Sequence, residues 1–211
     1  MKLVLPPKGT LKPNDEYDPL PYYYHPAVGW LFRRRLTMAL GLIPTGGRSI
    51  LEVGVGSGIL VPTLSSCFAE YRGSDLVLPE GLDRLVAANC HAEFVKADLL
   101  DESTLPAEAH DVVVCLSVLE HIADAERAAA ALARTLVRGG TLVTGYPMVN
   151  GLMANLFRMI GFGTIENHHV TAPATIHKAL GKVLKLEGRV SLPPLASVPA
   201  SLYQCTAWVK A

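Results

Sequence analysis

From Ser49 onward, short apolar segments alternate with segments of helical character, and this alternation restricts the fold more than any other feature of the chain. Strands that alternate with helices are typical of a mainly parallel sheet with helices on both faces. The segment 111–116 is apolar through its middle, as a strand covered on both faces should be. The sequence therefore predicts an α/β protein with a doubly wound sheet.

The order of the predicted elements adds an antiparallel edge to this sheet. Strands are predicted at 49–53, 71–76, 92–96, 111–116, 141–146, 184–190 and 202–210, and helices at 26–42, 57–68, 79–89, 125–137 and 171–180. The last two strands follow each other without an intervening helix, which indicates a hairpin at one edge. The first 25 residues contain several prolines, which block regular helix and central strand, so we expect them to be irregular.

Composition narrows the class of protein and its partners. The 211 residues suffice for one buried core, so we expect a single domain over 1–211. The formal net charge is zero, without the basic excess usual for nucleic-acid binding, which favours a small-molecule substrate over nucleic acid. No apolar stretch has the length of a membrane-spanning helix.

The four cysteines are too scattered to indicate a metal site or a redox pair. Cys67, Cys90, Cys115 and Cys205 form no CxxC motif, so we expect no bound metal. Separated thiols, and an N-terminal segment unlike a signal peptide, fit a reducing, cytoplasmic location.

The most informative motif lies where the first strand ends. Residues 50–58 run Ile-Leu-Glu-Val-Gly-Val-Gly-Ser-Gly, an apolar strand followed by three glycines at alternate positions and then a predicted helix. Glycines allow a tight turn and close approach of a ligand to the backbone, although a plain strand–helix turn also uses them. The dinucleotide pattern needs a third glycine at position 59, where this chain has Ile59, so an NAD-dependent oxidoreductase is disfavoured.

This loop resembles motif I of the class I methyltransferases that use S-adenosylmethionine (SAM), and further segments resemble that family in the same order. These segments are Arg72-Gly-Ser-Asp75, Phe94-Val-Lys-Ala-Asp98-Leu99, Leu119-Glu-His121 and Arg138-Gly-Gly140. The family usually has proline where this chain has Arg138, a difference that concerns the turn more than the chemistry. The chain is most similar to the small-molecule "type 11" group, which acts on quinone, lipid and secondary-metabolite acceptors.

The resemblance implies a Rossmann-like, seven-stranded sheet in the order 3-2-1-4-5-7-6, with strand 7 antiparallel. SAM would lie across the carboxyl ends of strands 1, 2 and 4 and leave as S-adenosyl-L-homocysteine (SAH). Asp75 would accept from both ribose hydroxyls, and Asp98 from the adenine amino group. The implied cofactor-binding residues are Glu52, Gly54, Val55, Gly56, Gly58, Asp75, Leu76, Asp98, Leu99, Leu116, Ser117 and His121.

The resemblance also divides the single domain into four parts. Residues 1–47 would cap the site, 48–147 would form the SAM-binding core, 148–183 would form an acceptor-site lid and helix, and 184–211 would form the closing hairpin. The apolar segment 148–163 favours a hydrophobic acceptor, although a packing helix or one that touches a membrane surface would have the same composition. The basic run 33–35 is expected to be a solvated face, with an anion contact as the alternative.

An oxygen or nitrogen acceptor can require a general base, and histidines supply the candidates. His121 lies in the motif after the fourth strand, and His168 and His169 precede the helix at 171. Each has an alternative as a structural or solvated residue. His25 and the tyrosines 22–24 are further candidates, and the tyrosines could equally pack the N-terminal segment onto the core.

We therefore expect SAM-dependent methyl transfer to a small, hydrophobic acceptor of quinol, phenol, lipid or secondary-metabolite type, by in-line displacement. The alternative from another class is a SAM-binding pseudoenzyme with a regulatory role, because the motifs report cofactor binding and not turnover. The sequence leaves open the acceptor, the atom methylated, and whether the protein is a monomer or a homodimer.

Overall fold

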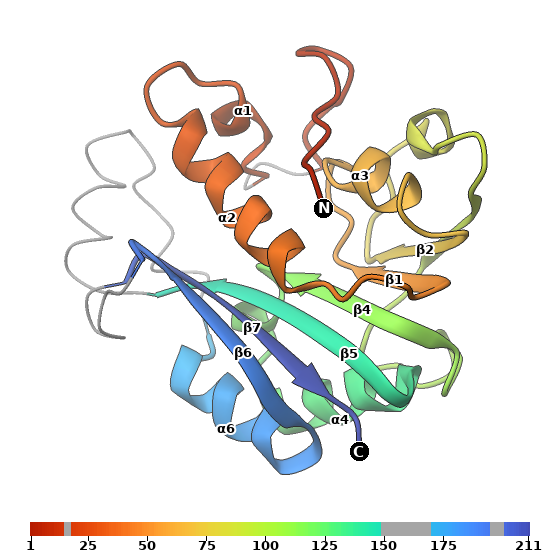
Figure 1. The fold of residues 1–211 in the computed structure, drawn as a ribbon, viewed down its shortest axis with the longest axis vertical. Coiled ribbons are helices and arrows are strands. Elements are labelled where there is room, and N and C mark those ends of the chain that lie inside the picture. Colours follow the sequence, from red (N-terminus) through yellow and green to blue (C-terminus); the bar gives the residue numbers. More distant parts are fainter. Residues whose placement is uncertain (15–17, 149–169, 195–200) are drawn as a thin grey trace.

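The computed structural model describes residues 1–14, 18–148, 170–194 and 201–211, which fold around a seven-stranded sheet (Figure 1). The strands are β1 (Ser49–Val53), β2 (Glu70–Asp75), β3 (His91–Lys96), β4 (His110–Leu116), β5 (Leu136–Pro147), β6 (Lys185–Leu192) and β7 (Tyr203–Val209). Their order is β3-β2-β1-β4-β5-β7-β6. The pairs among β1 to β5 are parallel, whereas β7 runs antiparallel to β5 and β6. The predicted fold class, strand order and edge hairpin are confirmed.

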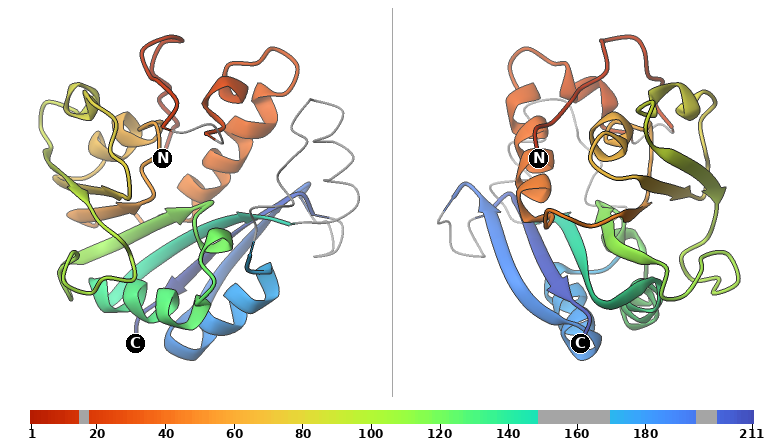
Figure 2. Two further views of the ribbon diagram at one scale, coloured as in Figure 1. Left: turned by 180° about the vertical axis from the view of Figure 1, so that it is seen from behind. Right: turned by 45° about the vertical axis from the view of Figure 1, so that its right-hand side comes forward.

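Helices cover both faces of this sheet (Figures 1 and 2). The longer helices are α2 (Gly29–Leu42), α4 (Ala125–Thr135) and α6 (Pro173–Val183). Short elements are α1 (Leu20–Tyr23), α3 (Val61–Ser65) and the 3-10 helices η1 (Leu82–Leu85) and η2 (Leu119–His121). α2 and α3 pack on one face, and α4 and α6 pack on the other. The predicted cap of α4 is present, because the Asp124 carboxylate accepts from the Arg127 amide at 3.0 Å.

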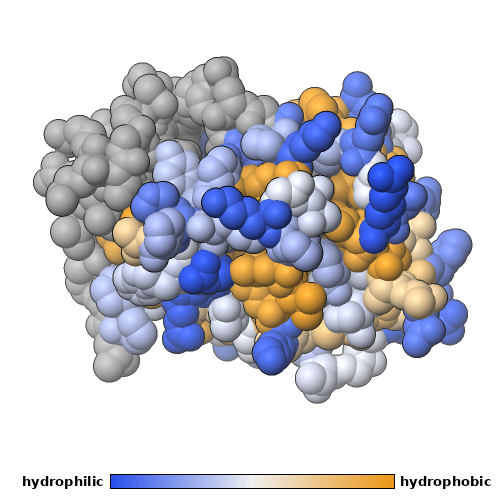
Figure 3. Space-filling model, turned by 90° about the horizontal axis from the view of Figure 1, so that it is seen from above, coloured by the Kyte–Doolittle hydropathy of each residue, from blue (hydrophilic) through white to orange (hydrophobic). Residues whose placement is uncertain are grey.

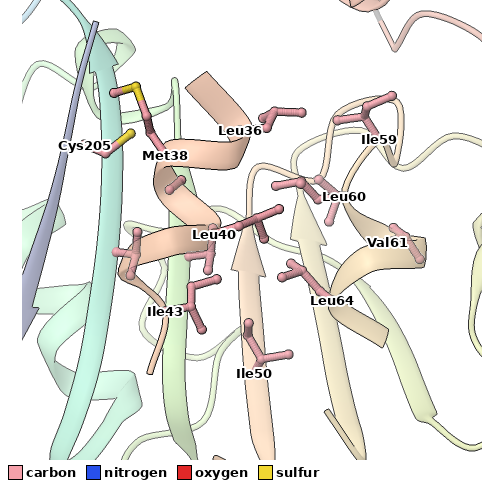
Figure 4. Packing of buried hydrophobic residues seen from close by; sticks show 14 of the residues in the cluster. Leu36, Met38, Leu40, Ile43, Ile50, Ile59, Leu60, Val61, Leu64 and Cys205 are labelled. Atoms are coloured by element: carbon pink, nitrogen blue, oxygen red, sulfur yellow. The ribbon is translucent and has the colours of Figure 1, made fainter. Parts of the chain in front are cut away.

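β1 shows how the two faces divide the core. All five of its residues are buried, and Ile50 and Leu51 belong to different hydrophobic clusters because successive side chains of a strand point to opposite faces. Figure 4 shows Leu40 and Leu64, from α2 and α3, converging with Ile50 on one face. In the same view Met38 of α2 lies beside Cys205 of β7. The helices are thus fixed mainly by apolar contact with the strands beneath them.

Two of the predicted helices are much shorter in the structure, and left-handed glycines explain why both begin late. The helix expected at 57–68 is reduced to α3, since Gly58 has a φ of 84° and cannot begin a right-handed helix. The helix expected at 79–89 is replaced by η1, which follows Gly81 with a φ of 82° and ends where Val86 becomes extended. The N-terminal segment is also less irregular than expected, because residues 20–23 form α1. The predicted lid lies mostly outside the described residues, which resume at 170.

The carboxyl ends of β1 and β4 lie side by side, and this contact positions the loops that follow them. Val53 pairs with Cys115, so the glycine loop and the turn after β4 leave the sheet together. A β-carbon at Gly54 would come within 2.2 Å of Val118 Cγ2, and Gly54 has a φ of 81°. Residue 54 therefore has to be glycine both for its backbone conformation and for the packing of Val118.

Substitution at this contact tests its contribution to stability. We expect Gly54→Ala to lower the free energy of unfolding by about 2–4 kcal/mol, because left-handed strain adds to overpacking against Val118. Gly139→Ala is the matched control, since Gly139 has a φ of 75° but has nothing within 4 Å of an added β-carbon. It should cost only about 1–2 kcal/mol. Urea denaturation without cofactor measures both, and equal losses would contradict the packing role of Val118.

Candidate functional site

The backbone of the glycine loop after β1 is open at Gly56. Gly54, Gly56 and Gly58 all have positive φ values, at 81°, 54° and 84°. The Gly54 and Val55 amides both donate to the Ser74 carbonyl, at 2.8 and 3.2 Å, which ties the loop to the end of β2. A β-carbon at Gly56 would meet no atom within 4 Å. The loop is therefore fixed on its β2 side and leaves room for a ligand above Gly56.

Asp75, the last residue of β2, joins this loop to the neighbouring strand. Its carboxylate accepts from the Gly56 amide at 2.7 Å and from the Val77 amide at 3.3 Å. The side chain is half-buried, so it also borders solvent. A carboxylate in this position can accept hydrogen bonds from a polyol that lies along the loop.

The ends of β2 and β3 add apolar and acidic side chains next to Asp75. Leu76 and Val77 are 61% and 56% exposed, which is unusual for residues beside a core strand. Asp98 is exposed and accepts from the Leu100 amide at 2.9 Å, whereas Leu99 is buried. A flat apolar ligand could pack against the exposed Leu76 and Val77 side chains and donate a hydrogen bond to the Asp98 carboxylate at its edge.

Glu52 lies beneath the loop, in the core. It is 4% exposed, and the Tyr71 hydroxyl donates to its Oε2 at 2.6 Å. Burial raises the pKa of Glu52 to about 8, against the opposing effect of the Tyr71 hydrogen bond and with a smaller upward contribution from Asp75. Glu52 is thus placed to support the loop from below.

The turn after β4 places the remaining predicted residues beside the glycine loop. Ser117 follows Leu116 with a φ of 56°, a conformation that residues other than glycine seldom adopt. Its amide donates to the Gly145 carbonyl at 2.7 Å, and its hydroxyl lies 3.0 Å from the Tyr203 hydroxyl. His121 is exposed at the end of η2. Backbone conformations like that of Ser117 are found most often at functional sites.

Sequence reasoning missed a cluster beside this turn, formed by Glu120, Arg35 and Tyr203. Glu120 is 2% exposed, and both of its carboxylate oxygens lack a hydrogen-bond partner. Burial raises the pKa of Glu120 to about 8, whereas its own nearby backbone amide and, more weakly, the charge of Arg35 act to lower it. Glu120 is part of the quoted motif at 119–121, but a sequence does not show which of two adjacent polar residues is buried.

The expectation of a solvated face at 33–35 is wrong for Arg35. Its guanidinium lies 4.8 Å from the Phe32 ring centre, 5.4 Å from that of Tyr23 and 5.5 Å from that of Tyr203. It also donates to the Tyr23 hydroxyl at 2.8 Å. Cation–π contacts to three rings can hold the charge away from bulk water.

The N-terminal tyrosines pack against the core. The Tyr22 ring stacks on Phe32 at 5.2 Å, Tyr23 is buried, and the Tyr24 hydroxyl donates to the Pro6 carbonyl at 2.7 Å. His25 is exposed just before α2 and accepts from the Ala27 amide at 3.2 Å. His168 and His169 lie outside the described residues, so their predicted roles stay predictions.

Comparison with known proteins identifies the class that has this fold and loop. Residues 51–144 match the family model Methyltransf_11, described as a methyltransferase domain. The chain is 28% identical over 184 residues to the ubiquinone biosynthesis O-methyltransferase of Salmonella typhi, with 80% of this chain and 69% of that protein covered.

Two solved structures share the fold. The N-methyltransferase NodS from Bradyrhizobium japonicum WM9, in complex with SAH, aligns with a TM-score of 0.63 at 20% identity, over 92% of each chain. Geranyl diphosphate C-methyltransferase from Streptomyces coelicolor A3(2) aligns with a TM-score of 0.66 at 13% identity, over 95% of this chain and 90% of that one. These proteins are named for methylation at different atoms, so the shared fold leaves the acceptor atom open.

The fold and the glycine loop, together with these matches, define a class I SAM-dependent methyltransferase. The chain resembles the type 11 methyltransferase group over residues 51–144, its cofactor is SAM, and it methylates a small substrate. The predicted family, enzyme class and cofactor are confirmed, and the NAD-dependent alternative finds no support. Among the helices of the described ranges, none combines the length and apolar character needed to cross a membrane.

The buried carboxyl of Glu52 gives stability a definite pH dependence. Between pH 4.5 and about 8 the folded protein keeps a proton that the unfolded chain has lost, so this group makes stability fall as pH rises through that window. We expect Glu52→Gln to remove up to about 1.4 kcal/mol per pH unit from that slope. Chemical denaturation at pH 5, 6.5 and 8 measures the slope. Glu102→Gln, at an exposed position, is the control. If stability depends on pH in the same way in the wild type, Glu52→Gln and Glu102→Gln, the raised pKa of Glu52 is refuted.

Proposed function

We propose that this enzyme transfers the methyl group of SAM to a hydroxyl oxygen of a small hydrophobic acceptor, such as a quinol or phenol. The observation that carries the proposal is the aromatic surrounding of the turn after β4, where the buried Tyr203 hydroxyl lies 3.0 Å from the Ser117 hydroxyl and the buried rings of Tyr23 and Phe32 pack with it around Arg35. Aromatic side chains favour flat, apolar ligands. The O-methyltransferase name of the relative from Salmonella typhi supports oxygen as the acceptor atom.

The residues at the carboxyl ends of β1, β2 and β3 fit the cofactor. Gly54, Gly56 and Gly58 would let its amino-acid tail lie against the backbone, and the open space above Gly56 supports this placement. Asp75 would accept from the ribose hydroxyls while keeping its contact with Gly56. The remaining proposed contacts are Val55, Leu76, Asp98 and Leu99 around the adenosine, with Leu116, Ser117 and His121 on the side of β4 and Glu52 below the loop.

The cofactor supplies an electrophilic methyl group when it is bound, so the protein's task is orientation and exclusion of water. The turn after β4 is suited to this task because Ser117 is fixed at three points, through its strained backbone, its amide and its hydroxyl. Residues fixed in this way hold two reactants in line without further reorganisation. His121, His168 and His169 stay candidates for proton transfer.

A transfer assay tests the proposed acceptor class. The enzyme is incubated with radiolabelled SAM and a matched set of 4-hexylphenol, 4-hexylcatechol, 4-hexylaniline and a hexyl glucoside. We expect labelled methyl ethers from the phenol and the catechol, and little or no transfer to the amine or the sugar. Transfer to the amine alone, or to none of the hydroxyl compounds while SAM binds tightly, would contradict the proposal.

Asp75→Asn tests the proposed ribose contact. The amide oxygen can still accept from the Gly56 amide, but the second oxygen and the charge are lost. We expect SAM and SAH to bind at least tenfold more weakly by calorimetry, because a hydrogen bond to a charged group is worth about 1.5–3 kcal/mol. Glu80→Ala, at an exposed position in the loop after β2, is the control and should bind normally. Unchanged affinity in Asp75→Asn would refute the contact.

A further inference from the structure

The Glu120 side chain is buried without a hydrogen-bond partner, although its backbone is firmly held. Its carbonyl accepts from the Val170 amide at 2.9 Å and from the Thr171 amide at 3.1 Å, which fixes the backbone of η2 at this residue. Neither carboxylate oxygen has a partner. A buried polar group without a partner costs about 1–3 kcal/mol, and such groups are rare in folded proteins. A hydrogen-bond donor that reaches this carboxyl would therefore find an unused acceptor.

Four elements bring titratable groups near Glu120. Its charge interacts with Arg35 of α2, Cys115 of β4, Tyr146 of β5 and Tyr203 of β7. α6 also packs against η2, but its lysines are exposed and its histidine lies against Trp208. Arg35 is thus the cation that acts on Glu120.

Arg35 and Glu120 attract each other but do not form an ion pair. Among the described residues the ion pairs involve other, largely exposed side chains. Arg35 donates instead to Tyr23 and is held over the aromatic rings. A hydroxyl group placed beside Glu120 would therefore find a proton acceptor, and the cation near it would stabilise the oxygen as it loses its proton.

This arrangement lies next to the cofactor loop. Val118, two residues before Glu120, fills the space beside Gly54, and Ser117 bonds to Tyr203. Glu120 thus belongs to the same turn that packs against the cofactor loop. Figure 3 shows the molecule from above, and the face seen there carries apolar surface between polar side chains.

We propose that Glu120 is the general base that removes the proton from the acceptor hydroxyl, an inference that rests on the proposed transfer to oxygen. The O–H bond breaks and its proton passes to the Glu120 carboxylate, while the oxygen electron pair forms the new bond to the methyl carbon. The S–CH₃ bond breaks, and its electron pair stays on sulfur to give SAH. Glu120 then releases the proton to solvent.

A phenolic or quinol hydroxyl suits this base better than an aliphatic alcohol. Proton transfer is efficient when donor and acceptor have similar pKa values. Burial raises the pKa of Glu120 to about 8, which approaches the value of about 10 for a phenol such as tyrosine. An ordinary exposed carboxylate would be a much weaker base.

Glu120→Gln tests the proposal because glutamine has the same shape and cannot accept the proton. With 4-hexylcatechol we expect kcat/KM to fall by about 100-fold or more, the usual contribution of a general base. With 4-nitrocatechol, which is already ionised at pH 8, the loss should be less than about fivefold. A structural role would lower both rates equally. Glu102→Gln is the control, and SAM affinity should stay within twofold in both variants.

The pH profile gives a second signature. The wild-type kcat/KM for 4-hexylcatechol should rise with pH and level off above about 8, because the carboxylate is the active form. Glu120→Gln should lack this limb. A limb that is unchanged in the variant would overturn the proposal.

A binding measurement provides a readout without turnover. The SAH-loaded wild-type enzyme should bind 4-hexylphenol about tenfold more tightly than its methyl ether, since only the phenol can donate to Glu120. This preference should disappear in Glu120→Leu, whose side chain accepts no hydrogen bond, and its persistence there would overturn the role of Glu120. Failure of the wild type to methylate any hydroxyl acceptor would overturn the proposed function itself. If the wild type is active and Glu120→Gln keeps that activity, only the role of Glu120 as the base is overturned.

Discussion

The packing of Val118 against Gly54 is the contact on which the arrangement of the site depends. It joins the loop after β1 to the turn after β4, at a position where no other residue type fits. Because the two strands are adjacent and parallel, both segments emerge at the same edge of the sheet. In the proposed function, a cofactor bound by the first segment and an acceptor bound by the second would therefore meet at this edge.

Asp75 extends this connection to the neighbouring strand. Its carboxylate accepts from Gly56, so the strand that would hold the ribose also fixes the loop that would hold the amino-acid tail. The same carboxylate would then serve the fold and the ligand together. This shared use explains why an acidic residue is needed at the end of β2 even before a ligand arrives.

The elements that could be predicted from sequence are those fixed by local patterns. The glycines of residues 54–58, the acidic end of β2 and the alternation of strands and helices led to the fold, the family and the cofactor. The helix predicted at 79–89 failed because its sequence does not show that Gly81 adopts a left-handed conformation. Glycine is compatible with both conformations, so only packing decides between them.

The cluster around Glu120 could not be predicted because its members are distant in sequence. Arg35 comes from α2 and Tyr203 from β7, and they meet only through the antiparallel strand that closes the sheet. Three consecutive arginines also look equivalent in a sequence. In the fold Arg35 lies over three rings, whereas Arg33 donates to the Tyr23 carbonyl.

Glu52 and Glu120 show how a supporting carboxyl differs from a reactive one. Both are buried, and burial raises the pKa of each to about 8. Glu52 receives a hydrogen bond from Tyr71, which satisfies it and fixes it beneath the loop. Glu120 receives none, so its desolvation cost stays uncompensated in the free enzyme. Since burial raises the pKa of both groups, the hydrogen-bond partner and not the pKa distinguishes the candidate base, and an acceptor hydroxyl would both donate to Glu120 and supply the proton.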